Sequence, residues 1–266
     1  MSLLTHFGLT KEPFARDIPA EELMRFAAHR EMTVRLQFAA EHRQAALVTG
    51  DTGTGKSTAI RAVMKRMDEN RYRFMYVASR ALTPKTLYRE MLERLQIQPR
   101  FRHTDNQTLT RQALTDSFEK GVQWVLAVDE AHELDVAMLA EFRFLLNFHA
   151  DSFSPLSLWL IGQGELREKL RLRVLASLAQ RIQVRYAMTG LQETEVAAYM
   201  EEQLKRAGRD LSLFSEEAVV WGTKASQGNP RLVGSLCRAA MLDAAYRKDH
   251  RVELAHMERA WNEVNG

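Results

Sequence analysis

Short, continuously apolar runs alternate with amphipathic stretches along most of the chain, and this alternation limits the possible folds more than any other feature. The runs cover residues 45–49, 74–78, 124–128, 156–161 and 182–186. Such runs are typical of strands covered on both faces, as in a parallel sheet. Helical patterns lie around and between them, at residues 21–42, 57–67, 84–95, 109–119 and 136–148. We therefore expect a layered α/β fold around a five-stranded parallel sheet.

The pattern changes after Met188, where the strand-like runs stop. Helical periodicity continues at residues 193–207, 216–226, 230–247 and 253–264, with turn signals at Gly208 and at Gly228-Asn229-Pro230. We expect two domains: an α/β domain at residues 1–188, which includes an N-terminal helical segment at 1–43, and a small helical domain at 189–266.

The loop after the first apolar run has the pattern glycine, four residues, then Gly-Lys-Ser, which is typical of a phosphate-binding P-loop. Its residues are Gly50, Asp51, Thr52, Gly53, Thr54, Gly55, Lys56, Ser57 and Thr58. Glycines allow backbone N–H groups to face phosphate oxygens, and the helix that follows presents its positive end to the same anion. Lys56 would reach the β- and γ-phosphates, and the Ser57 hydroxyl is a suitable Mg²⁺ ligand.

Two carboxylates, Asp129 and Glu130, follow the third apolar run. They would lie at the carboxyl edge of the sheet, where open α/β sheets bind ligands. Asp129 would hold Mg²⁺ through water, and Glu130 would orient and polarise the attacking water in phosphoryl transfer. The string Asp129-Glu130-Ala131-His132 also spells a helicase box, but such helicases need two motor domains and 266 residues have room for one. We expect His132 to be a loop residue without a catalytic role.

The charge of the chain is concentrated in one segment. Residues 61–111 hold twelve basic and five acidic residues, a net charge of +7, whereas the whole chain carries +3. Such a segment is either a set of solvated helix faces or a surface for a polyanion.

Composition and the N-terminus limit the compartment. The chain has one cysteine, Cys237, which excludes an internal disulfide and points to a reducing environment. Its spacing within residues 230–247 is that of a small core residue. The apolar runs are far shorter than the roughly 20 residues that span a bilayer, and no signal peptide pattern is present. We therefore expect a cytoplasmic protein without a membrane partner.

Two further residues complete a recognisable set. Gln163 ends the fourth apolar run, and Arg231 opens a helix of the C-terminal region. Together with the P-loop and the carboxylate pair, this set resembles the AAA+ ATPases over residues 6–264. The resemblance implies an αβα sandwich with a C-terminal helical lid, ATP and Mg²⁺ as cofactors, and ATP hydrolysis as the activity. It also places Gln163 at sensor 1, where many members carry Asn, Ser or Thr, and Arg231 at sensor 2.

Four strings resemble the ExeA-like branch of these ATPases. They are His6-Phe7-Gly8-Leu9 with Glu12-Pro13-Phe14, and the segments at residues 141–148, 162–170 and 180–186. This branch contains the secretion ATPase ExeA and ATPases that accompany transposases, similar to TnsC, MuB and TniB.

The resemblance assigns further roles. Arg181, just before the fifth apolar run, takes the place of an arginine finger that reaches a neighbouring subunit's γ-phosphate; the alternative is a surface arginine in an arginine-rich stretch. Phe14 and Ile18 would contact adenine, or would simply fill the core. In TnsC-like proteins the loops after residues 78 and 98 face DNA, and here these loops carry Arg80, Lys85, Arg100, Arg102, His103 and Thr104.

The resemblance leaves three functions open. The first is an ATPase that oligomerises as a ring or filament on double-stranded DNA and recruits or regulates a transposase. The second is an ExeA-type ATPase of secretion machinery, which would need a membrane helix and a wall-binding module that this sequence lacks. The third is a nucleotide-gated switch with little turnover, against which the water-activating Glu130 argues. We expect the first.

Overall fold

The computed structural model describes residues 2–15, 26–78, 82–148 and 154–265. The chain forms two compact units. The described parts of residues 30–51 and 59–188 make up one, here called the sheet unit, and those of residues 1–29, 52–58 and 189–266 make up the other, the helical unit. The described residues up to 29, which we expected within the α/β domain, thus make their contacts in the helical unit.

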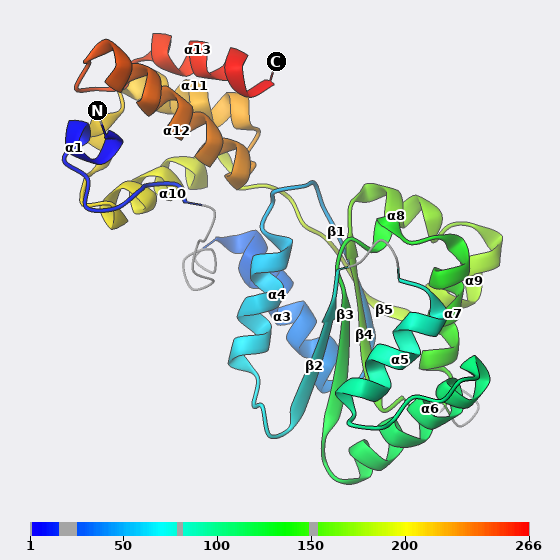
Figure 1. Ribbon diagram of the computed structural model, residues 1–266. Coiled ribbons are helices and arrows are strands. Elements are labelled where there is room, and N and C mark those ends of the chain that lie inside the picture. Colours follow the sequence, from blue (N-terminus) through cyan, green and yellow to red (C-terminus); the bar gives the residue numbers. More distant parts are fainter. Residues whose placement is uncertain (1, 16–25, 79–81, 149–153, 266) are drawn as a thin grey trace. The chain divides into compact units, whose positions relative to one another are not determined.

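A five-stranded sheet forms the centre of the sheet unit (Figure 1). Its strands are β1 (Ala45–Thr49), β2 (Tyr72–Val77), β3 (Gln123–Val128), β4 (Leu156–Gly162) and β5 (Ile182–Ala187). They pair in the order β2-β3-β4-β1-β5, and every pairing is parallel. The sheet predicted from the five apolar runs is confirmed, with strand ends that differ by at most two residues.

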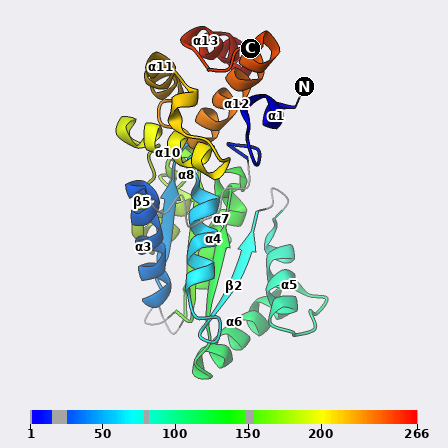
Figure 2. The same cartoon turned by 90° about the vertical axis from the view of Figure 1, so that its left-hand side faces the viewer.

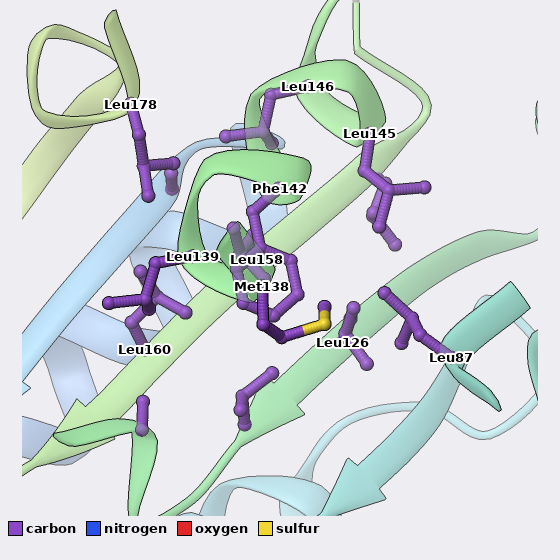
Figure 3. Close-up of a cluster of buried hydrophobic side chains, with 14 of the residues drawn as sticks. Leu87, Leu126, Met138, Leu139, Phe142, Leu145, Leu146, Leu158, Leu160 and Leu178 are labelled. Carbon is purple, nitrogen blue, oxygen red and sulfur yellow. The ribbon is translucent and has the colours of Figure 1, made fainter. Parts of the chain in front are cut away.

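Helices cover both faces of this sheet, and alternate residues of each strand point to opposite faces. Ala46 and Val48 of β1 pack with α3 (Ala27–Glu41) and α4 (Lys56–Arg66). Leu47, by contrast, belongs to the core shared with α5 (Pro84–Arg94) and α7 (Val136–Leu146). Figure 3 shows Phe142 and Leu139 of α7 in this second core, beside Leu158 and Leu160 of β4. Because both faces are buried, polar residues are rare in the central strands.

Three details of the sheet unit differ from the prediction. Helix α6 (His103–Glu119), which packs on α5 (Figure 2), begins six residues before residue 109. Its first turn is polar and gives no apolar period, but the buried Asn106 fixes it by exchanging hydrogen bonds with the backbone of Arg100. Helix α7 ends at Leu146 because Asn147 is extended, and Arg111 donates to its carbonyl at 2.7 Å. The short helices α8 (Gly164–Lys169) and α9 (Ala176–Gln180) were not expected.

The helical unit contains α1 (Leu3–Phe7), α10 (Glu193–Arg206), α11 (Glu216–Ser226), α12 (Pro230–Arg247) and α13 (Leu254–Asn265). Its core includes Phe7, Phe14, Tyr199, Leu236 and Cys237. Burial raises the pKa of the Cys237 thiol, as expected for a packing residue. Residues 21–25 of the helix expected at 21–42 lie outside the described residues. Within the described chain, no helix combines the length and apolarity that a bilayer crossing needs.

Candidate nucleotide site

The topology of the sheet brings the predicted catalytic strands to one edge. Strand β4 lies between β1 and β3, and all three are parallel, so that they end together. The P-loop begins at Gly50 after β1, Gln163 follows β4, and Asp129 follows β3. The carboxyl edge therefore carries the start of the phosphate loop, a polar amide and two carboxylates, in that order.

The phosphate loop joins β1 to α4, which begins at Lys56. Gly53 and Gly55 have φ angles of 86° and 96°, a region that other residues rarely adopt. The loop leads into the start of α4, and the positive end of a helix is a favourable place for an anion. Lys56 and Thr54 are buried, whereas Ser57 at the start of the helix is exposed. These donors suit the phosphates of ATP, and the Ser57 hydroxyl suits Mg²⁺.

Sequence reasoning missed the contact that His29 makes with this loop. The ring is 1% exposed and lies near the backbone of Thr54. Burial lowers the pKa of His29 to about 4, although the Thr54 backbone and the charge of Glu195 act in the opposite direction. His29 is thus neutral near pH 7. It lies inside a predicted helix, and nothing in the sequence around it indicates this role.

The turn that contains Arg231 contacts the P-loop within the helical unit. Asn229 donates from Nδ2 to the carbonyl oxygen of Thr52 at 2.7 Å, and its Oδ1 accepts from the N–H of Arg231 at the start of α12. A Cβ atom placed on Gly53 would lie 2.8 Å from the Arg231 Cβ. Arg231 itself is exposed, so that its guanidinium is available to a nucleotide bound by the loop.

The carboxylate pair is held by two different sets of contacts. Asp129 is buried, and its carboxylate accepts from the Tyr76 hydroxyl at 2.6 Å and from the N–H of Glu130 at 2.9 Å. Glu130 has a φ of 52° and an exposed side chain. The geometry suits one fixed oxygen ligand for Mg²⁺ beside a carboxylate that can contact water.

His132 connects Glu130 to Gln163. Its Nδ1 lies 3.3 Å from Glu130 Oε2, and its Nε2 lies 2.9 Å from Gln163 Nε2. We expected His132 to be a loop residue without a catalytic role. It lies in the short 3-10 helix Ala131–Glu133, and its ring makes both of these contacts.

Arg167 is a second side chain at this edge without a predicted role. It comes from α8, and its Nη2 donates to the Thr49 hydroxyl at 2.8 Å, next to the start of the P-loop. The string at residues 162–170 contains it, but only the fold brings it to the end of β1.

Arg181, the candidate arginine finger, and Phe14, a candidate adenine contact, make other contacts in the structure. Arg181 donates from Nη1 to the carbonyl and hydroxyl of Ser177, at 2.8 and 2.6 Å. Phe14 is 3% exposed and packs against Tyr199 in the helical core, which supports the core-filling interpretation. Ile18 lies outside the described residues.

The predicted DNA-contacting residues fall into three groups. Arg80 lies outside the described residues. Lys85 and Thr104 are exposed, but in the first turns of α5 and α6 rather than in loops. His103 is also in α6, where its ring packs edge-on against Tyr88 and its Nε2 is buried.

Arg100 and Arg102 are exposed in the loop before α6, which the Asn106 hydrogen bonds hold in place. Between them, Phe101 is 96% exposed. Arg89, Arg100 and Phe101 line an open hollow of about 510 Å³. Sequence reasoning missed Phe101, although an aromatic residue between two arginines was a visible signal.

Comparisons with known proteins agree with this geometry. Residues 39–170 match the AAA domain family. The chain is 30% identical over 264 residues to General secretion pathway protein A of Aeromonas hydrophila, in an alignment that covers 98% of this chain and 48% of that protein. The chain thus spans about half the length of this relative.

Solved structures resemble the AAA domain and the helical region together. Cdc6p from Pyrobaculum aerophilum matches with a TM-score of 0.71 and 16% identity, covering 94% of this chain and 70% of that chain. The Aeropyrum pernix ORC1 protein, solved in complex with DNA, matches with a TM-score of 0.62 and 20% identity, covering 94% and 67%. The predicted AAA+ P-loop fold is confirmed.

Proposed function

We propose that this chain is an ATPase that assembles on double-stranded DNA and regulates or recruits a transposase. The P-loop binds the phosphates of ATP, Asp129 holds Mg²⁺, and Glu130 activates the attacking water. The observation that carries the proposal is the strand order, which aligns the P-loop strand, Gln163 and the carboxylate pair along one edge of the sheet.

The exposure of the Glu130 side chain favours ATP hydrolysis over a nucleotide-gated switch. Its side chain is 49% exposed, so that water can reach the carboxylate, while Asp129 is separately fixed by Tyr76. A protein that only binds nucleotide needs the phosphate loop but no water-activating carboxylate.

A DNA partner is supported by the basic segment and by one of the structural neighbours. Exposed arginines flank the exposed Phe101 in a loop held by Asn106. Arginines at such a surface suit phosphates, and an exposed aromatic ring suits a base or a groove. The ORC1 protein similar to this chain was solved with DNA.

Self-assembly is supported by apolar side chains next to the finger candidate. Leu172 is 46% exposed and Val174 is 60% exposed, just before helix α9 and Arg181. Neighbouring apolar residues of this size on a surface suit a contact with a second copy of the chain. In such a contact, Arg181 would exchange Ser177 for the nucleotide of the neighbour.

A role in secretion is the second candidate, because the relative from Aeromonas hydrophila is a general secretion pathway protein. The likeness covers only about half of that protein. The two candidates differ in the partner of the ATPase rather than in its chemistry. A transposase gene beside the gene for this chain would favour the first, and genes for secretion components would favour the second.

The test is an ATPase assay of the purified chain with and without duplex DNA, combined with electron microscopy in an ATP analogue. We expect turnover that rises with DNA, and rings or filaments that need both ligands. Turnover indifferent to DNA and a monomer under all conditions would contradict the proposal.

A further inference from the structure

The imidazole of His132 lies between two side chains of the candidate hydrolysis site. Nδ1 is 3.3 Å from Glu130 Oε2, and Nε2 is 2.9 Å from the Gln163 amide nitrogen. The His132 side chain is 9% exposed, whereas that of Glu130 is 49% exposed. A buried ring therefore holds a carboxylate that would otherwise rotate in solvent.

The ring also contacts the backbone of Gln163, whose N–H donates to Nδ1 at 3.4 Å. Nδ1 therefore faces both this N–H and the Glu130 carboxylate, while Nε2 faces the Gln163 side-chain amide. Glu133 Oε1 lies 3.7 Å from Nε2, beyond hydrogen-bond distance. The ring of His132 thus lies against the Glu130 carboxylate and against both the backbone and the side chain of Gln163.

The surrounding backbone fixes the ring. Lys169 donates to the carbonyl oxygens of His132 and Leu134, which anchors the 3-10 turn. At the end of β4, a Cβ atom on Gly162 would lie 3.1 Å from the backbone nitrogen of His132 and 3.2 Å from Nδ1 of its ring. The approach of the ring to the strand end therefore depends on glycine at position 162.

The backbone of Glu130 adds to this arrangement. Its φ of 52° places a non-glycine residue in the left-handed region, a strained conformation that persists only where neighbours enforce it. The N–H of Glu130 donates to Asp129 Oδ1, and its carboxylate contacts His132. Both determine where the carboxylate points.

We propose that His132 is a positioning residue, which orients the Glu130 carboxylate and couples it to Gln163. This inference rests on the proposed ATP hydrolysis. In that reaction, the water oxygen bonds to the γ-phosphorus and a water proton passes to Glu130. The bond from the γ-phosphorus to the bridging oxygen breaks, and ADP keeps its electron pair. A turn of the Gln163 amide changes the contact at Nε2, and the rigid ring transmits this change to Glu130.

The first test replaces the ring. We expect His132→Ala to lower kcat about 10–100-fold, as when a supporting residue of a reactive group is lost, with KM and ATP affinity within about twofold of wild type. His132→Asn retains a polar side-chain group near the position of Nδ1, and should recover part of the lost kcat. His42→Ala is the matched control, because His42 is an exposed histidine directly after α3, with Nδ1 at 2.9 Å from the Phe38 carbonyl oxygen.

The second test asks whether His132 and Gln163 act as a unit. If they do, the loss of kcat in the double variant His132→Ala with Gln163→Ala is smaller than the product of the two single losses. Gly162→Ala displaces the ring without removing it, and should lower kcat in the same direction. This variant and His132→Asn also provide the readout if His132→Ala fails to fold.

The outcomes separate this inference from the proposed function. If wild type does not hydrolyse ATP, the proposed function fails and the inference falls with it. If wild type hydrolyses ATP and His132→Ala does so at the same kcat, the positioning role is wrong while the function stands. If His132→Ala or Gly162→Ala loses ATP affinity together with kcat, the residue has a merely structural role, which also overturns the inference.

Discussion

Asn229 joins two functions in one side chain: its Nδ2 donates to the Thr52 carbonyl oxygen at 2.7 Å, and its Oδ1 caps helix α12. The cap places Arg231 at the helix start, and the Nδ2 bond connects that start to the P-loop. The sensor 2 candidate and the phosphate loop are therefore positioned relative to each other by one amide.

We expect Asn229→Ala to lose both functions. Loss of the cap should lower the free energy of unfolding by about 1 kcal/mol. Loss of the Thr52 bond should weaken ATP binding several-fold, measured by titration with a fluorescent ATP analogue. Ser215→Ala is the matched control, because Ser215 caps α11 by accepting from Ala218 N–H and should lose stability alone. Equal ATP affinity in both variants would contradict the role of the Thr52 bond.

The sequence predicts the layers of this fold better than its site contacts, for a physical reason. A strand buried on both faces needs apolar residues throughout, so that the run at residues 124–128 is visible without any partner. The contacts of His29 with Thr54 and of Asn229 with Thr52 join residues far apart in the chain, and no local pattern encodes them. The start of α6 was missed because a buried polar residue, Asn106, fixes it rather than an apolar period.

The P-loop and the carboxylate pair predict two separable defects. Lys56→Ala should abolish or greatly weaken ATP binding, because it removes the cation at the phosphates. Glu130→Gln should bind ATP like wild type but hydrolyse it at least about 100-fold more slowly, since an amide cannot take a proton from water. Binding and single-turnover assays measure the two effects. Wild-type hydrolysis by Glu130→Gln would show that another group activates water.

His29 predicts a pH dependence of stability. Its pKa in the folded chain is about 4, below the ordinary value of 6.5, so the unfolded chain takes up the proton first as the pH falls. Above about pH 6.5, protonation of His29 has no effect on the free energy of unfolding. Between pH 6.5 and 4, protonation of His29 in the unfolded chain lowers the free energy of unfolding by up to about 3 kcal/mol, at about 1.4 kcal/mol per pKa unit. Urea unfolding across this range measures the effect.

The control for that measurement is the neutral variant His29→Gln. Its unfolding free energy should fall less steeply between pH 6.5 and 4 than that of wild type. His42→Gln changes an exposed histidine directly after the same helix and should keep the wild-type slope. If the two variants have the same slope, burial of His29 is not the cause.

Arg181 predicts a shared active site. Acting in trans, it stabilises the charge that develops at a neighbour's γ-phosphate. Arg181→Ala should therefore bind ATP normally and hydrolyse it slowly. Mixing it with Lys56→Ala should restore some activity, because mixed assemblies contain interfaces with an intact P-loop and an intact arginine. Ser177→Ala removes only the hydroxyl that Arg181 contacts at 2.6 Å, and should retain activity. Full activity of purified Arg181→Ala would refute the assignment.

The basic segment predicts the salt dependence of DNA binding. Arg102 and Lys85 are exposed, and each phosphate contact that they make releases counterions, so that log affinity falls by about 0.9 per contact for each unit of log salt. Replacing both with alanine should flatten the slope and weaken binding to all sequences alike, because phosphate contacts carry no sequence information.

The alternative is that both residues lie on a solvated face without contact to DNA. The control pair, Lys205→Ala with Arg247→Ala, removes the same charge from exposed ion pairs of the helical unit. A filter-binding salt titration with saturating ATP analogue decides whether Lys85 and Arg102 contact DNA. A slope that matches wild type, or a flattening equal to that of the control pair, would exclude Lys85 and Arg102 as specific contacts.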